Sequence, residues 1–519
     1  MKIKRLLIGA MAAGLLLTAC NSANKDDVTY DEEYDITVWV SEVEGMDTLT
    51  KQQIKEFGDS SKIKYNVTLE QQSESDAATK MITDVTNGAD IFCFAQDQTM
   101  RLVKAGALSE IVGNGAKAIK EEHDSDAVAA VTFNNSIYAY PLTSDNGYFL
   151  YYDKTVISDD IADDFSKILK ACEDADKTLS FEGDTSGWYL ASWFFGAGCV
   201  SEWTVTDDGD FTAVNDTFNS DNGLKAARAF YNFASSKAYL SSSDGGDFSK
   251  GSAAVVSGTW AYNTVKATLG NNMGVAELPS YTIDGQKYHL GSFKGCKLMG
   301  VKPQSDPKKA VALNKLAVYL TSEKAQLERF EAVAWGPSNK AAQQNEKVLA
   351  NPALTAVRNQ SPYAVTQGQI HGSWWGLATT LGTAIKESKG DTAVMQAALE
   401  KYDDSEQALF ALDKTAWLLV GFGNWDNADM TLQATKVDDT HFEATVEIAD
   451  DLGYKGGRFV HPGEWSNDFG GTIVDEASQS LIDVDLSTSG DHNIVFLTGG
   501  TYKLTLDTSV PSIHIEKLA

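Results

Sequence analysis

The residues best suited to chemistry in this chain are its aromatic side chains. The sequence holds 11 Trp, 19 Tyr and 22 Phe among 519 residues. Each ring offers a flat apolar face and, in Trp and Tyr, a polar tip, which suits the C–H faces and hydroxyl rims of sugars. A half-covered ring contributes on the order of 1 to 2 kcal/mol, so several rings must act together. The aromatic candidates in predicted loops or turns are Phe94, Trp188, Tyr189, Trp260, Trp335, Trp374, Trp375, Trp425 and Trp465.

No motif of a catalytic, nucleotide-binding or metal centre occurs in the sequence. The patterns G-x-S-x-G, H-E-x-x-H, G-x-x-x-x-G-K-[ST] and G-x-G-x-x-G are absent, and the seven His never stand three or four residues apart. Paired carboxylates carry no information in a chain with 72 acidic residues. We therefore expect no catalytic residue, no metal site and no cofactor, and a binding protein rather than an enzyme.

The charge balance excludes one class of partner. Lys and Arg number 43 against 72 Asp and Glu, which gives a formal net charge of −29. Phosphate backbones are held mainly by cationic side chains, so nucleic acid is not an expected partner. The length and the 43% hydrophobic content predict about three folding units of roughly 150 residues each.

The N-terminus predicts export and lipid anchoring. A basic start precedes an apolar run that ends at Ala19 and is shorter than the roughly 20 residues that span a membrane. The sequence Leu17-Thr-Ala-Cys20 resembles the lipobox of bacterial lipoproteins, which implies a signal peptide over residues 1–19 and lipidation of Cys20. A plain signal peptide with an incidental Cys is the alternative. Residues 20–33 are polar and aperiodic, which predicts a flexible tether.

The main part of the chain, residues 34–412, is predicted to be α/β. Strand patterns over 35–40, 64–71 and 91–95 alternate with helix patterns over 49–57 and 77–86, which is typical of βαβ units. Further strands are expected over 138–142 and 148–152, and further helices over 190–200, 222–234, 308–331 and 392–412. Cys93, Cys172, Cys199 and Cys296 are expected as buried thiols, with a Cys172–Cys199 bridge as the alternative.

The pattern changes near residue 413 to short alternating runs separated by turn residues. This is typical of an all-β sandwich, which we expect over residues 413–519 as an appended module. The predicted strands are 417–422, 430–437, 441–448, 458–461, 493–497, 501–507 and 512–517.

Three segments, in order along the chain, resemble extracellular solute-binding proteins of family 1, the maltose-binding type. They are Gly88 to Gln98 with Leu102 to Leu108, Asn134 to Lys154, and Lys250 to Trp260. The resemblance spans about residues 34–412. It implies a two-lobed, periplasmic-binding-protein-like α/β fold that is hinged, with a ligand in the cleft between the lobes and closure on binding.

The resemblance also implies which side chains contact a sugar. Trp260 would stack on a sugar ring, and Phe94 would hold a position that is usually aromatic. Asp97 and Asp145 would bond to hydroxyl groups.

Other positions follow less closely from the resemblance. Trp188 or Tyr189 would supply an aromatic wall from the second lobe, and Trp374 or Trp375 a later one, since adjacent rings on a helix cannot both face one core. Ser41, Glu42 and Glu44 replace a differently charged loop after the first strand, and Gln98 stands where a cation is common. These departures leave the exact sugar open.

The C-terminal region resembles the starch-binding sandwich modules of pullulanases and surface starch lipoproteins. The similar segments are Trp417 to Gly421, Asn424 to Asp426, Arg458 to Phe459 with Trp465 to Gly470, and Thr501 to Asp507. The resemblance implies Trp425 and Trp465 as platforms for an α-glucan, with Lys455, Arg458 and Asn467 as hydrogen-bond partners. The alternative is that Trp417 and one of these rings fill the sandwich core.

Together these features predict a cell-surface lipoprotein that binds malto-oligosaccharides or α-glucans between its lobes and delivers them to an ABC transporter. The expected partners are the sugar, transporter subunits on separate chains, and the membrane through the lipid anchor. The expected location is the outer face of the cytoplasmic membrane of a Gram-positive bacterium. A glycan-capture adhesin without a transport role, a different oligosaccharide ligand and an extracellular glycosidase are the alternatives.

Overall fold

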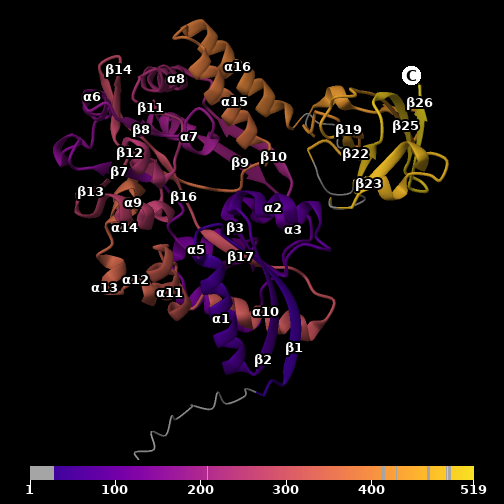
Figure 1. The fold of residues 1–519 in the computed structure, drawn as a ribbon, viewed down its shortest axis with the longest axis horizontal. Helices are drawn as coiled ribbons and strands as arrows, with labels where there is room; N and C mark the ends of the chain where they lie inside the picture. The colour runs from indigo at the N-terminus through magenta and orange to yellow at the C-terminus, as the bar shows by residue number, and fades with distance from the viewer. Residues whose placement is uncertain are drawn as a thin grey trace, which may run out of the picture.

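The computed structural model describes residues 29–206, 209–410, 415–427, 429–463, 468–486, 488 and 492–518. The predicted signal peptide, Cys20, most of the predicted tether, Trp465 and Asn467 lie outside the described residues. Figure 1 shows two α/β lobes with an all-β unit beside them. Among the described residues, none of the helices is long and apolar enough to cross a membrane.

The first lobe is built on a five-stranded sheet with the strand order β2-β1-β3-β17-β6. Strands β1, β2 and β3 run parallel, and β17 pairs antiparallel with β3 and β6. The strands are β1 (Glu32–Val40), β2 (Ile63–Gln71), β3 (Ile91–Ala95), β6 (Tyr140–Pro141) and β17 (Lys297–Val301). The helices are α1 (Met46–Ser61), α2 (Glu74–Thr83), α3 (Thr99–Lys104), α4 (Gly113–Glu122), α5 (Ser125–Ala130), α10 (Pro307–Leu320) and α11 (Glu323–Val333). The short hairpin of β4 (Thr132–Phe133) and β5 (Ser136–Ile137) precedes β6.

The second lobe repeats this architecture with the strand order β11-β8-β12-β7-β13. The strands are β7 (Phe149–Asp153), β8 (Thr178–Ser180), β11 (Tyr239–Leu240), β12 (Ser252–Ser257) and β13 (Met273–Ala276). Two hairpins extend from it, β9 (Ser201–Val205) with β10 (Phe211–Asp216) and β14 (Ser280–Ile283) with β15 (Gln286–His289). The helices are α6 (Phe165–Asp174), α7 (Gly187–Gly196), α8 (Asp221–Ala234), α9 (Tyr262–Leu269), α14 (Pro352–Gln360), α15 (Trp374–Glu387) and α16 (Thr392–Ala408).

Three segments join the two lobes, over residues 142–148, 290–296 and 334–351. The second contains β16 (Ser292–Lys294), which pairs in parallel with β18 (Ala364–Thr366). The third contains the short helices α12 (Lys340–Gln343) and α13 (Glu346–Leu349). These crossings form the hinge region between the lobes.

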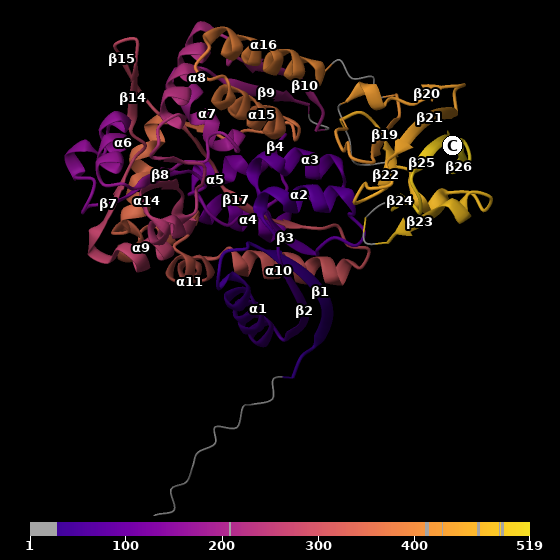
Figure 2. The ribbon, with the colours of Figure 1, turned by 45° about the horizontal axis from the view of Figure 1, so that its top comes forward.

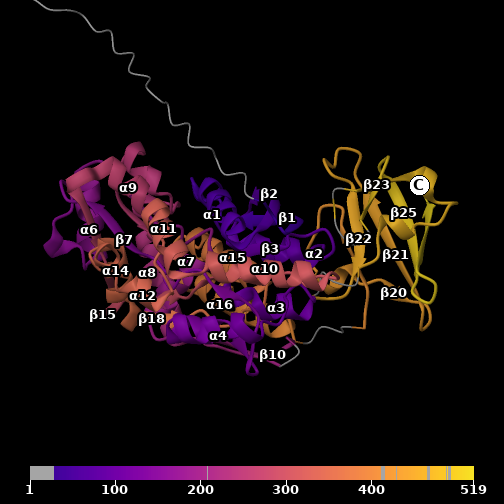
Figure 3. The same ribbon diagram turned by 90° about the horizontal axis from the view of Figure 1, so that it is seen from below.

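The all-β unit is a sandwich of two four-stranded sheets with the orders β19-β22-β24-β23 and β20-β21-β25-β26. One core unites them, with Phe459 and Ile494 from one sheet against Leu504 and Ile513 from the other. The strands are β19 (Leu418–Gly421), β20 (Thr435–Lys436), β21 (His441–Ile448), β22 (Gly456–Val460), β23 (Ile482–Asp485), β24 (Asn493–Phe496), β25 (Gly500–Asp507) and β26 (Ser512–Lys517). Figures 2 and 3 show the sandwich next to the end of the main body that carries α2 and β10.

Most predicted elements form, and the differences have local causes. The helix predicted over 308–331 is two helices, because Ser322 caps α11 by accepting a hydrogen bond from the Ala325 backbone N–H. The strand predicted over 430–437 is a 3-10 turn, Met430–Leu432, followed by the short β20. Strand β23 was not predicted, because Asp alternates with its apolar residues and disfavours strands.

The four described cysteines are buried free thiols. The prediction of buried thiols is therefore confirmed, and the alternative Cys172–Cys199 bridge is absent from the described residues.

Candidate functional site

A cavity of about 1210 Å³ lies between the two lobes. The segments after β1, β3 and β12 all contribute to its lining, so the cavity opens at the carboxyl ends of strands from both sheets. This is the usual position for a ligand in α/β folds. Its volume exceeds the roughly 1,000 Å³ at the upper end of pockets for drug-sized molecules, so it has room for an extended ligand.

Two tryptophans from the second lobe form an aromatic wall in this cavity. The ring centroids of Trp188 and Trp260 lie 5.9 Å apart. Trp260 follows β12 in a 3-10 turn, and a Cβ added at Gly258 would lie 2.1 Å from its indole, so a larger residue there would displace the ring. Trp188 is the second residue of α7, and Tyr148 packs edge-on against its ring at 4.5 Å and donates a hydrogen bond to its carbonyl. The wall is therefore held by packing from behind while it faces the cavity.

A lysine from the first lobe lies opposite these rings. Lys297, the first residue of β17, is buried, and its Nζ donates a hydrogen bond of 2.7 Å to Asn146 Oδ1. The same Nζ lies 4.8 Å from the centroid of the Trp260 ring and 5.2 Å from that of Trp335. An ammonium group has three donors. Lys297 and Asn146 both line the cavity, so this cation can offer a donor to a ligand oxygen.

A hydrogen-bonded chain connects the lobes on the cavity floor. Asp97 accepts a hydrogen bond of 2.7 Å from Gln367 Nε2, and Gln367 Oε1 accepts one of 3.1 Å from Trp188 Nε1. The other Asp97 oxygen accepts from Gln98, whose own oxygen accepts from Arg101. Burial raises the pKa of Asp97 to about 7. The buried side chain of Gln367 therefore bridges the Asp97 carboxyl group and the Trp188 indole.

The β9–β10 hairpin of the second lobe reaches across to α3 of the first. Lys104 Nζ lies 2.8 Å from Asp210 Oδ1. At Gly209, where φ is +86°, an added Cβ would lie 2.8 Å from the Met100 carbonyl oxygen. Glycine permits this close approach of the two backbones. Lys104, Gly209 and Asp210 all line the cavity, so the hairpin forms part of its wall.

Most of the residues predicted to contact a ligand line this cavity. They are Glu42, Asp97, Trp188, Tyr189, Trp260 and Trp375. Of the adjacent pair on α15, Trp375 lines the cavity, whereas Trp374 is buried in the core of the second lobe and donates a hydrogen bond to Tyr402. The two rings therefore face different surroundings, as their adjacency on a helix requires.

Four predicted residues do not line the cavity. Glu44 is exposed on the loop before α1. Phe94 is buried in the first lobe against Phe92, because both faces of the central strand β3 are covered. Asp145 is also buried and does not line the cavity. The fourth residue is Trp374, described above.

Asp145 lies in the hinge region rather than at the cavity surface. Its Oδ2 accepts hydrogen bonds from Thr259 Oγ1 and from the Gly336 backbone N–H, both at 2.5 Å. Thr259 belongs to the second lobe, and Gly336 lies on a segment that joins the lobes. The carboxylate therefore ties these segments together.

The predicted residues of the sandwich have different surroundings. Trp425 is 38% exposed and stacks on Tyr454 at 6.3 Å. Lys455 donates to the Leu452 carbonyl. Arg458 is buried, with its Nε 2.5 Å from Asn493 Oδ1 and an ion pair to Asp468, so its guanidinium faces the protein interior.

Lys297, Asn146 and Gln367 line the cavity but were not among the predicted site residues. One signal for Lys297 was available, since a lysine at the start of the apolar run Lys297–Val301 is unusual for a buried strand. Asn146 lies in the polar segment between two predicted strands. Gln367 carries no signal in the sequence, because only the fold brings it next to Asp97.

Comparison with known proteins extends this description. A family model for bacterial extracellular solute-binding proteins matches residues 52–356. No curated protein sequence matches the chain. A solved structure described as a complex with acarbose is 28% identical, with a TM-score of 0.63, and the match covers 72% of this chain and 99% of that one.

Two further structures share the fold. The maltodextrin-binding protein MalE1 from L. casei BL23 without ligand is 21% identical, with a TM-score of 0.60 and coverage of 72% of this chain and 98% of that one. A cyclo/maltodextrin-binding protein complexed with maltotetraose is 22% identical, with a TM-score of 0.55 and coverage of 71% and 95%. These matches confirm the two-lobed fold, and the C-terminal sheets form an additional all-β region.

Proposed function

Because the chain belongs to the bacterial extracellular solute-binding protein family, we propose that it binds an α-linked gluco-oligosaccharide of the maltodextrin type between its lobes. The observation that carries this proposal is the wall of Trp188 and Trp260 in the interlobe cavity. Support for the sugar class comes from similar structures described as bound to acarbose or maltotetraose. Stacked rings in a large, partly polar cavity suit a neutral, hydroxylated chain.

Each group of the cavity has a role in this binding. The two tryptophans stack on the apolar faces of sugar rings, and Trp375 covers a further face. Lys297 donates to a sugar oxygen, and Glu42 and Asp97 accept hydrogen bonds from hydroxyl groups. Asp145 acts from the hinge region, where it positions the turn that carries Trp260.

The bound sugar is then delivered to an ABC transporter whose membrane and ATPase subunits are separate chains. Closure of the lobes on the sugar is the signal that the transporter recognises. Cys20 carries the lipid anchor, and residues 20–33 tether the protein to the outer face of the cytoplasmic membrane. The net charge of −29 keeps the receptor from binding polyanions nonspecifically.

The C-terminal sandwich binds starch or related α-glucans. The stacked and exposed pair of Trp425 and Tyr454 supplies the ring surface for this contact. Lys455, Trp465 and Asn467 remain further candidates for it. Arg458 supports the sheet from within, because both of its described partners are buried side chains.

Calorimetry tests the sugar assignment. The purified protein is titrated with maltotriose, cellotriose and xylotriose, and we expect binding of the first with clear preference over the other two. Failure to bind maltotriose would refute the assigned sugar class. Small-angle scattering with and without maltotriose then tests closure, and an unchanged radius of gyration would contradict the receptor mechanism.

A variant locates the site. Trp260→Ala removes one ring of the wall and is expected to weaken maltotriose binding by about tenfold, while the protein is still pulled down by granular starch. The matched control is Tyr363→Ala, an exposed ring outside the cavity. Full maltotriose affinity in Trp260→Ala would show that the sugar lies elsewhere.

A further inference from the structure

The interlobe cavity continues beyond the two lobes to the sandwich. Its lining includes Trp425, Asp426, Asn427, Pro462 and Gly463 of the sandwich, together with the residues of both lobes described above. The exposed ring of the sandwich and the aromatic wall of the lobes therefore belong to one continuous cavity.

Internal contacts of the sandwich hold these residues at the cavity. The Gly463 backbone N–H donates a hydrogen bond of 2.7 Å to the Asn427 carbonyl, which joins the loop after β19 to the loop after β22. The His461 ring lies 2.8 Å from the Ala416 carbonyl, next to the point where the chain enters the sandwich. Trp425 is backed by Tyr454. The loop that carries Trp425 is therefore fixed to the side of the sandwich nearest the lobes.

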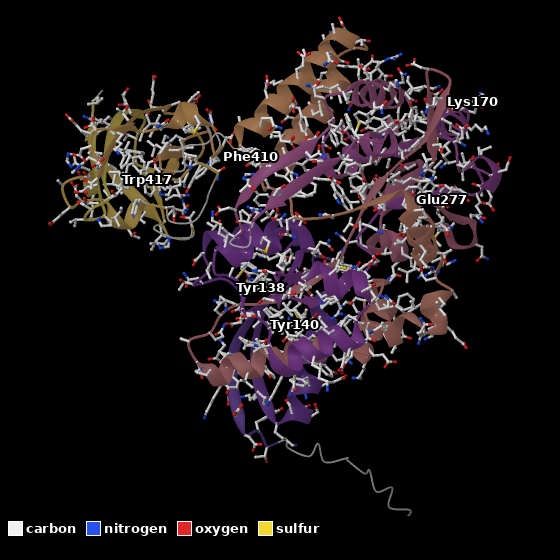
Figure 4. All side chains as sticks on the ribbon, turned by 180° about the vertical axis from the view of Figure 1, so that it is seen from behind. Tyr138, Tyr140, Lys170, Glu277, Phe410 and Trp417 are labelled. Atoms are coloured by element: carbon white, nitrogen blue, oxygen red, sulfur yellow. The ribbon has the colours of Figure 1, made fainter. Side chains whose placement is uncertain are left out.

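The connection between lobes and sandwich is short. Phe410 lines the cavity wall, and Figure 4 shows it on the edge of the main body that faces the sandwich. From Phe410 to Thr415 a fully extended chain spans at most about 18 Å. The sandwich must therefore stay close to the mouth of the cavity.

The cavity wall between the lobes and Trp425 is suited to an uncharged, hydroxylated ligand. Phe211, His371 and Phe410 contribute rings, with Phe211 and His371 5.2 Å apart, and Asp210 and Asp426 contribute carboxylates. The net charge of the chain, −29, disfavours an anionic ligand. Rings and hydrogen-bond acceptors in the same wall suit the units of an oligosaccharide.

We infer that the sandwich completes the interlobe site, so that one gluco-oligosaccharide held at Trp188 and Trp260 extends past His371 and Phe211 to Trp425. This inference rests on the proposed function and adds to it. The sandwich then acts as the outer subsite of the receptor, which selects for longer chains, and the same ring surface contacts starch.

The test compares a short and a long ligand by calorimetry. In the wild-type protein we expect maltoheptaose to bind at least about fivefold more tightly than maltotriose, with one maltoheptaose per protein. In Trp425→Ala this ratio of affinities falls to about twofold or less, and Trp425→Phe, which keeps a ring, retains most of it. The control Tyr363→Ala keeps the wild-type ratio.

A measurement on the wild-type protein does not depend on the folding of a variant. Hydrogen exchange of residues 424–427 is expected to slow with maltoheptaose but not with maltotriose. A stoichiometry of two maltoheptaose molecules, an unchanged ratio in Trp425→Ala, or equal exchange with both ligands would overturn the continuous site. If the wild-type protein does not bind maltotriose at all, the proposed function itself would be refuted.

Discussion

Lys297 Nζ lies 4.8 Å from the centroid of the Trp260 ring, and the two residues come from different lobes. A cation over an indole face is stabilised by the ring quadrupole, more strongly where water is excluded. Lys297 is buried, so the contact links the position of the first lobe to that of the stacking ring in the second. A sugar that stacks on Trp260 and a movement of the lobes therefore both affect the contact between Lys297 and Trp260.

The first prediction concerns the amine of Lys297. Lys297→Met keeps the length and apolar stem of the side chain but removes the donor to Asn146 and to the ligand. We expect maltotriose affinity to fall by about 10- to 100-fold, as for the loss of a charged hydrogen bond. The melting temperature is expected to change little, because removal of a buried charge is offset by the loss of the hydrogen bond to Asn146. Lys170→Met, an exposed residue of α6, is the control, and equal affinities in both variants would contradict this role.

The second prediction uses the adjacent tryptophans of α15. Trp374→Ala leaves a core cavity and is expected to lower the free energy of unfolding by about 3 to 5 kcal/mol. Trp375→Ala is expected to change stability little and to weaken maltotriose binding by about five- to tenfold. Thermal unfolding and calorimetry on both variants check this. The reverse pattern would mean that the two rings had been assigned to the wrong surroundings.

The third prediction tests whether Asp145 stabilises the hinge region or contacts the ligand directly. Asp145→Ala leaves the Thr259 hydroxyl and the Gly336 backbone N–H without their acceptor, and we expect a loss of about 3 kcal/mol in the free energy of unfolding. The ratio of affinities for maltotriose and cellotriose is expected to stay constant. Asp174→Ala on the surface of α6 is the control. A changed sugar preference in the Asp145 variant would favour direct contact with the ligand.

The fourth prediction concerns pH. Burial raises the pKa of Asp97 from 3.8 to about 7. Between about pH 4 and pH 7 the folded chain keeps this proton while the unfolded chain has lost it, so the free energy of unfolding falls as the pH rises through this range. From pH 5 to pH 8 this loss is on the order of 3 kcal/mol.

Asp97→Asn removes this titration, so its free energy of unfolding is expected to fall less between pH 5 and pH 8. Denaturant unfolding of both proteins at the two pH values measures the difference. Burial also raises the pKa values of Asp216 and Glu406, but both groups are present in both proteins and cancel in the comparison. Equal losses in the two proteins would show that Asp97 is ionised throughout.

The sequence predicted the architecture better than it predicted the site. Alternating strand and helix patterns predicted an α/β fold, and the resemblance carried by segments such as Lys250 to Trp260 implied its two lobes. The resemblance implied Phe94 as a ligand contact, but Phe94 does not line the cavity, because both faces of its strand are covered. Lys297 was missed because it is brought to Trp260 by an antiparallel strand that enters the sheet of the first lobe from the hinge.

The connection between the lobes and the sandwich could not be predicted from residue patterns. Trp425 was predicted as a platform from its own module, and only the arrangement in space adds it to the interlobe cavity. A shared cavity depends on the relative position of two folding units, and hydrophobic periodicity carries no information on that position.

The four buried thiols have a consequence for where the protein can work. Burial raises the pKa of each of Cys93, Cys172, Cys199 and Cys296, which suppresses the reactive thiolate. All four thiols are buried in the cores of the two lobes. In oxidising surroundings, reaction of these thiols therefore first requires local unfolding of the lobe that buries them.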